Sequence, residues 1–168
     1  MENLMYVVPV VSVLALLFAG YLAVKVAKQE EGTEKMKEIA SAISEGARAF
    51  LTAEYKILIV FVMVLFLLIG FGIGNWVTAI CFVVGALFST LAGYFDMNVA
   101  TKANVRTANA ARESGMNKAL SIAFSGGAVM GMCVAGLGAL GVSVVYILTK
   151  DVDVLSGFCL LYTSPSPR

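Results

Sequence analysis

Long apolar runs dominate the pattern of hydrophobic and polar positions in this chain of 168 residues. Three of them carry no charged side chain: Asn3–Val24, Ile57–Phe95 and Ala119–Thr149. A helix rises about 1.5 Å per residue, so about 20 apolar residues cross the ~30 Å hydrocarbon core of a bilayer. The first and third runs fit one crossing each, and the second is long enough for two. The pattern therefore predicts an all-α, polytopic transmembrane helical bundle of about four spans, at residues 4–26, 57–73, 76–97 and 119–149.

A short stretch with turn chemistry, Gly70–Trp76, breaks the second run. Its sequence, GFGIGNW, contains three glycines that weaken a helix, and Asn75 suits a turn. Trp76 suits the aromatic belt at a membrane interface. We therefore expect a helical hairpin in which Ile57–Ile73 crosses the membrane and Trp76–Phe95 returns.

Two polar segments separate the apolar runs. In Glu30–Lys56, apolar residues recur at three- and four-residue spacing, which predicts an amphipathic helix. Glu31 and Lys35 are spaced for an ion pair on such a helix. We expect a solvated helix that leads into the next span; the alternative is a docking surface for other parts of a larger protein. The second segment, Gly93–Arg112, holds small residues, Asn, Thr and three cations, and predicts a short polar connection between two spans.

The cations are strongly clustered along the chain. The segments that follow the first and third predicted spans carry ten of them: Lys25, Lys28, Lys35, Lys37, Arg48, Lys56, Lys102, Arg106, Arg112 and Lys118. The hairpin turn carries none, and the loop after the fourth span carries only Lys150. Since cytoplasmic loops are enriched in Lys and Arg, we expect both cationic segments in the cytoplasm and the N-terminus outside, in a multi-pass protein of the cell membrane.

The two ends of the chain each leave an alternative open. A secretory signal peptide competes with a first span, but such a peptide starts with cations and has a shorter apolar centre. Here the start carries Glu2 and the cations follow the run, which favours an uncleaved span. At the other end, residues 154–161 resemble the start of a fifth span and then stop in TSPSPR. We therefore expect residues 159–168 to be a non-native or frame-disrupted tail.

Composition excludes several kinds of function. The chain is 60% hydrophobic and only 14% charged, and its net charge is +1, so it offers no basic surface for nucleic acid. It contains no His, which excludes His-based catalysis and metal ligation within these residues. The three cysteines have no CxxC spacing and two lie in apolar runs, so we interpret them as packing residues.

Small residues in the fourth predicted span suggest contact with other helices. Gly127 and Gly131 form a GxxxG pair, a pattern that lets helix backbones approach closely in a membrane. The nearby stretch Gly136–Gly141 matches the dinucleotide fingerprint GxGxxG, but that motif needs a preceding strand and a βαβ unit. Within a membrane helix it does not indicate nucleotide binding. Asp151 and Asp153 alone are weak evidence for a cation site.

Three blocks of sequence carry a resemblance to a known family. They are ISEGARAFLTAEYK at Ile43–Lys56, VATKANVRTANAAR at Val99–Arg112 and ALSIAFSGGAVMGMCVAGLGALG at Ala119–Gly141. Together with the apolar layout, over about residues 1–158, the chain resembles the N-terminal part of the membrane-bound, ion-translocating pyrophosphatases. Asp96 departs from that pattern, because a small residue, usually Gly, is expected there.

The resemblance implies a homodimer whose subunits have roughly sixteen spans. Members hydrolyse Mg²⁺-pyrophosphate at the cytoplasmic face and move H⁺ or Na⁺ outward, and some require K⁺. Asp carboxylates on later helices of the family hold the Mg²⁺ ions, and none of those motifs matches a position here. The resemblance therefore implies no catalytic, substrate-binding or metal residue in this chain. It also implies that the four spans belong mostly to the outer ring of helices.

Three residues remain as functional candidates. The resemblance suggests that Lys102 and Arg106 organise the cytoplasmic face near the phosphate site, while the alternative is topogenic charge and loop packing. Asp96 is a candidate because it is ionisable and ends a span, although its place beside the polar segment favours a wet interfacial carboxylate.

The sequence supports two alternative functions. The first is the N-terminal part of a pyrophosphate-driven ion pump, inactive alone. The second is a small four-span membrane scaffold or assembly subunit that binds other helices through Gly127 and Gly131.

Overall fold

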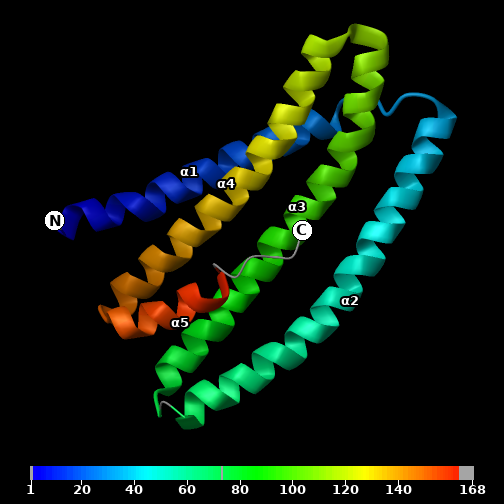
Figure 1. The fold of residues 1–168 in the computed structure, drawn as a ribbon. Helices are drawn as coiled ribbons and strands as arrows, with labels where there is room; N and C mark the ends of the chain where they lie inside the picture. Colours follow the sequence, from blue (N-terminus) through cyan, green and yellow to red (C-terminus); the bar gives the residue numbers. More distant parts are fainter. Residues whose placement is uncertain (1, 73, 163–168) are drawn as a thin grey trace.

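The computed structural model describes residues 2–72 and 74–162 and shows a bundle of helices (Figure 1). No strand occurs within these residues. Four of the helices are long and apolar enough to cross a membrane. The helices are α1 (Glu2–Ala27), α2 (Glu34–Gly72), α3 (Trp76–Ser114), α4 (Met116–Thr149) and α5 (Val152–Tyr162). The prediction of an all-α bundle with four helices of spanning length is confirmed.

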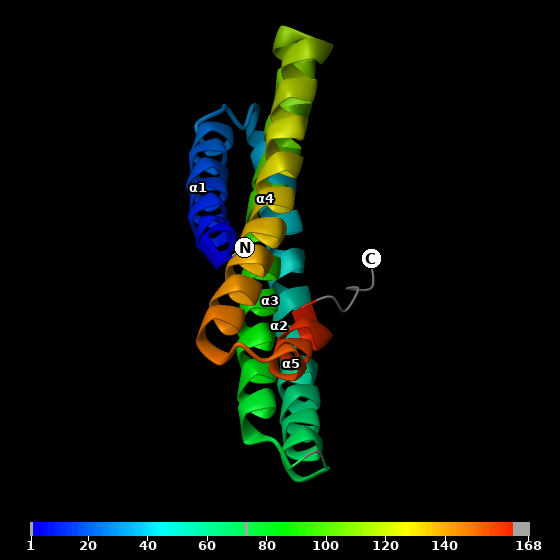
Figure 2. The same cartoon turned by 90° about the vertical axis from the view of Figure 1, so that its left-hand side faces the viewer.

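Helices α3 and α4 form a long antiparallel pair at the centre of the bundle (Figures 1 and 2). The turn between them is Gly115, whose φ of 84° suits glycine. Small side chains let the two helices approach closely: a Cβ added to Gly126 would lie 3.0 Å from the Cβ of Ala103. Ala110 and Ala119 continue this contact toward the turn.

The other two long helices, α1 and α2, each pack on a different member of the α3–α4 pair. Helix α1 lies mainly on α4, where Ala19, Leu22 and Val129 form a buried cluster. Among the described helices, α2 contacts only α3, through buried Phe82 and Ala86 and the apolar residues of α2 around them. Figure 2 shows α1 standing to one side of the α3–α4 pair.

The turn between α2 and α3 lies within the predicted glycine-rich stretch. Asn75 caps α3, because its side-chain oxygen accepts hydrogen bonds from the backbone N–H groups of Val77 and Thr78. The Trp76 ring fills the space beside Gly70, where an added Cβ would lie 2.9 Å from the ring. Asn75 therefore caps the start of α3, and Trp76 packs this start against the end of α2.

The prediction of a short polar connection at Gly93–Arg112 is wrong. These residues are an uninterrupted part of α3, which continues to Ser114. Alanine is frequent in the segment and favours helix. Its polar side chains bond back along the helix, as when Asn98 and Thr101 donate to the carbonyls of Tyr94 and Met97. The polar segment is therefore a rigid helical extension, and the connection shrinks to a turn at Gly115.

Helix α5 packs against α3 through two glycines. A Cβ on Gly85 would lie 2.5 Å from the carbonyl oxygen of Phe158, and one on Gly157 would lie 2.8 Å from that of Thr78. The Phe158 side chain is fully buried between α3 and α4. Of the expected non-native tail, residues 163–168 lie outside the described part of the chain.

The cations gather at one end of the bundle. This end, called here the cationic end, comprises residues 25–48 and 101–118, and it lies at the top of Figure 1. The α2–α3 hairpin turn lies at the opposite end. Large apolar side chains such as Ile57, Ile59 and Val60 of α2 are exposed on the outside between the two ends, as expected for a lipid-facing surface.

Candidate functional site

Arg106 is the centre of the polar contacts at the cationic end. Its side chain is only 8% exposed. The guanidinium donates three hydrogen bonds: Nε to the Gln29 carbonyl at 3.0 Å, Nη1 to the Lys102 carbonyl at 2.9 Å, and Nη2 to Glu31 Oε1 at 2.7 Å. Gln29 and Glu31 belong to the α1–α2 connection, residues 28–33. Arg106 therefore ties this connection to α3.

Burial of a cation is costly unless its charge and its donors are satisfied. The planar guanidinium of arginine carries five donors in a rigid fork, so it can bond two separate chain segments in a fixed geometry. Here Nη1 turns back to its own helix while Nε and Nη2 reach across to the connection. The carboxylate of Glu31 supplies the opposite charge, although its side chain is 41% exposed.

Asn109, one turn further along α3, makes a second attachment. It is 3% exposed, and its Nδ2 donates to the Glu30 carbonyl at 3.4 Å. Its Oδ1 accepts a hydrogen bond from Arg112. Gly32 lies directly against it, with φ of 89°, and an added Cβ would lie 2.6 Å from Asn109 Oδ1. The connection can follow this path only because residue 32 is glycine.

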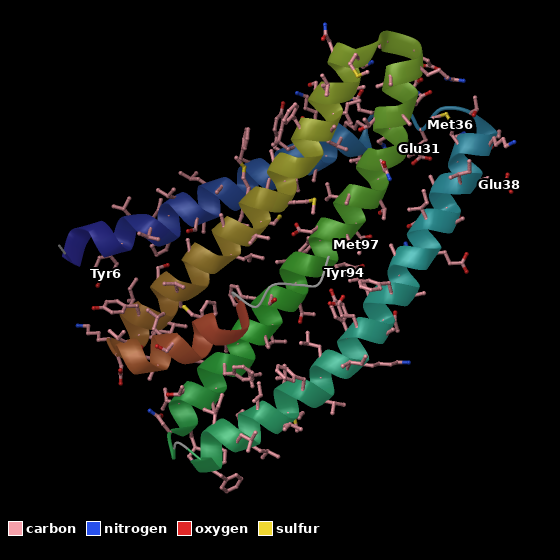
Figure 3. The ribbon with its side chains drawn as sticks, in the orientation of Figure 1. Tyr6, Glu31, Met36, Glu38, Tyr94 and Met97 are labelled. Atoms are coloured by element: carbon pink, nitrogen blue, oxygen red, sulfur yellow. The ribbon has the colours of Figure 1, made fainter. Side chains whose placement is uncertain are left out.

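The structure changes the expected ion pairs in this region. Glu31 precedes α2, which begins at Glu34, so Glu31 pairs with Arg106 instead of Lys35. In the first turn of α2, Lys37 and Glu34 form an ion pair at 2.8 Å. Its hydrogen bond and opposite charge raise the pKa of Lys37 above the ordinary value for lysine. Figure 3 shows Glu31 near α3 and Met36 in the first turn of α2.

A hollow of ≈ 460 Å³ lies between the first turns of α2 and the upper part of α3. Lys102 and Arg106 share one wall, and Lys37, Glu45 and Arg48 of α2 contribute to the other. The structure thus places Lys102 and Arg106, the two candidates from the sequence, beside the same hollow, but their side chains differ in exposure and bonding. The donors of Arg106 are engaged within the chain, whereas the Lys102 side chain is exposed.

Gly127 and Gly131 face away from the described helices. An added Cβ at either position would meet nothing within 4 Å. Within α4, the glycines at close contacts with other helices are instead Gly126, Gly136 and Gly141. The packing role of Gly127 and Gly131 therefore stays a prediction, and it concerns partners other than the described helices.

Asp96 lies in α3 on the side that faces α4. One oxygen, Oδ1, is buried and has no hydrogen-bond partner among the described residues. The carboxyl lies close enough to Cys133 of α4 for the two groups to interact electrostatically. This geometry argues against a fully hydrated carboxylate, because one of the two oxygens does not reach water.

The described residues offer no ready set of ligands for Mg²⁺. Within them, no three Asp, Glu, His or Cys side chains come together as a metal-binding group.

The partners of Arg106 were not predicted from the sequence. Gln29 and Glu31 lie 77 and 75 positions away from it. No local periodicity signals a contact at that separation. Gly32, in the Glu-Glu-Gly sequence at 30–32, indicates a tight turn, but this local sequence does not indicate which helix the turn contacts.

Comparison with known proteins gives consistent matches along the chain. A family model described as inorganic H⁺ pyrophosphatase matches residues 13–163. A Clostridium tetani protein, named as a candidate K⁺-stimulated pyrophosphate-energized sodium pump, is 50% identical over 161 residues, which cover 95% of this chain and 24% of that protein. A Methanosarcina mazei protein, named a K⁺-insensitive pyrophosphate-energized proton pump, is 43% identical over 94% of this chain and 24% of its own length. The chain thus spans about a quarter of the length of these relatives.

Replacing Arg106 with alanine is expected to destabilise the fold by about 2–3 kcal/mol. The change removes three hydrogen bonds from a charged donor and leaves Glu31, which is partly hydrated, without its partner. The midpoint of thermal unfolding of the purified chain in detergent measures the effect. Arg48→Ala is the matched control, because Arg48 is exposed at the same end. Equal shifts for the two variants would contradict a structural role for the Arg106 contacts.

Replacing Asp96 with alanine is expected to stabilise the protein, by about 1 kcal/mol. The change removes a buried oxygen that has no hydrogen-bond partner. Thermal unfolding should show a higher midpoint for Asp96→Ala, a smaller change for Asp96→Asn, and none for Glu38→Ala on the exposed face of α2. A lower midpoint for Asp96→Ala would mean that the carboxyl is satisfied in the folded protein.

Proposed function

This chain belongs to the inorganic H⁺ pyrophosphatase family, and from that premise we propose that it forms the N-terminal membrane region of a pyrophosphate-energised ion pump. The observation that carries the proposal is the match of 94–95% of the chain to two such pumps. In the proposed full-length protein, hydrolysis of Mg²⁺-pyrophosphate at the cytoplasmic face drives H⁺ or Na⁺ outward. Sodium and proton pumps both occur among the relatives, as do K⁺-stimulated and K⁺-insensitive ones.

We propose that this region supports the pump without performing its chemistry. The acidic residues that hold Mg²⁺ and the substrate would come from the rest of the full-length subunit, and the region alone would be inactive. Its contribution would be a set of outer helices with a rigid cationic end. Two copies of the full-length subunit would form a homodimer.

Within that region, Arg106 is proposed as a positioning residue. Its guanidinium is buried and its hydrogen bonds go to Gln29, Glu31 and Lys102, so it would act by holding the α1–α2 connection against α3 and not by binding pyrophosphate. Lys102 would keep the neighbouring surface positive. Both roles would require the cationic end to lie in the cytoplasm, on the side where pyrophosphate would be hydrolysed.

The second candidate function is a four-span scaffold without catalysis. The observation that favours it is the outward position of Gly127 and Gly131, which leaves a small-residue face on α4 open to another helix. In a full-length pump this face would receive a later helix of the same subunit. In a scaffold it would receive a helix of a different protein.

A chimera separates the two functions. Residues 13–162 of this chain would replace the matching segment of the Clostridium tetani relative, and the product would be assayed in membrane vesicles for phosphate release from Mg²⁺-pyrophosphate and for ion uptake. We expect the chimera to retain both activities, because it supplies the same outer helices. The chain expressed alone should release no more phosphate than vesicles without it.

Two outcomes would contradict this assignment. A chimera that folds and inserts but neither hydrolyses pyrophosphate nor transports ions would favour the scaffold. Phosphate release by the isolated chain would show that it contains an active site. The chimera with Arg106→Ala tests the positioning role: unchanged hydrolysis and transport would reject it, while Arg48→Ala should leave both unchanged.

A further inference from the structure

A second hollow, of ≈ 390 Å³, lies on the outside of the bundle between α1 and α3. Its α1 wall is the last apolar turn of that helix, Ala23–Ala27, except Lys25, which does not line it. Its α3 wall consists of Tyr94, Phe95, Asn98, Val99 and Lys102. We call this hollow the α1–α3 groove.

The groove exists because α1 packs mainly on α4 and touches α3 only slightly. The edge of α3 beside α1 is therefore left uncovered. Tyr94 and Phe95 are 50% and 51% exposed, and their rings pack edge to face at 6.0 Å. Tyr94 is visible midway along α3 in Figure 3. A half-exposed tyrosine such as Tyr94 is typical of the level where a membrane meets water.

The groove changes from apolar to cationic along its length. Tyr94, Phe95 and Val99 line it within or just beyond the predicted span 76–97, and Lys102 lies about two helical turns beyond Tyr94 and Phe95. The Lys102 side chain is exposed and has no ion-pair partner among the described residues. A ligand that fits has an apolar tail beside an anionic head.

We propose that the α1–α3 groove binds a phospholipid with an anionic headgroup. The acyl chain lies along Val24 and the Tyr94–Phe95 pair, and the headgroup phosphate pairs with Lys102. Basic pockets between membrane helices are established sites for such lipids. Free phosphate fits less well, because most of the groove wall is apolar and would gain nothing from it. This inference goes beyond the proposed pump function, since it rests on the lining and exposure of the groove between α1 and α3.

Native mass spectrometry of the full chain in detergent tests the proposal. The probes are phosphatidylglycerol and phosphatidylcholine with identical acyl chains, and the readout is the apparent dissociation constant of the first bound lipid. Phosphatidylglycerol should bind more tightly than phosphatidylcholine. Lys102→Ala should weaken phosphatidylglycerol binding about fivefold, the effect of one cation near a headgroup, and leave phosphatidylcholine unchanged.

Two further variants keep the test specific. Lys118→Ala removes a cation from the same end of the bundle but outside the groove, and it should leave phosphatidylglycerol binding unchanged. Ala27→Phe fills the groove and should weaken both lipids. Equal losses for Lys102→Ala and Lys118→Ala would overturn the proposal in favour of general electrostatic attraction. Displacement of phosphatidylglycerol by millimolar inorganic phosphate would overturn it in favour of a phosphate site.

Discussion

The close antiparallel contact of α3 with α4 is the interaction on which the rest of this structure depends. Small side chains at Ala103, Ala110, Ala119 and Gly126 allow it, since in a lipid environment helices associate through packing and not through the hydrophobic effect. Helix α1 packs on α4, and α2 packs on α3. Helix α5 packs against both α3 and α4. The pair extends beyond the predicted spans, so its upper part becomes a rigid platform for the polar residues of the cationic end.

Arg106 fixes the α1–α2 connection against this upper part of α3. The connection after α1 has no regular structure of its own, and its position depends on hydrogen bonds to α3. Arg106 and Asn109 supply these from successive turns, and Gly32 allows the chain to pass close beside them. A buried arginine is tolerated here because Glu31 and two backbone carbonyls satisfy it. In the proposed pump, the same contacts would hold the α1–α2 connection against α3.

Much of this fold could be predicted from the sequence, because membrane insertion imposes strong rules on apolar length and charge. Those rules correctly predict four helices of spanning length and the break at Gly70–Trp76. They fail at Gly93–Arg112, where Asn and Thr resemble a loop but bond back to their own helix among alanines. The partners of Arg106 and the outward direction of Gly127 and Gly131 also escape prediction, since long-range contacts and the rotation of a helix leave no local pattern.

The proposed pump requires the cationic end to face the cytoplasm and the α2–α3 turn to face outside. The most direct test is labelling of single cysteines at positions 74 and 38 with a membrane-impermeant maleimide, in a chain whose three native cysteines are replaced by serine. In intact cells, Gly74→Cys should react at once, and Glu38→Cys should react only after permeabilisation. Reaction of Glu38→Cys in intact cells, with Gly74→Cys protected until permeabilisation, would contradict the account.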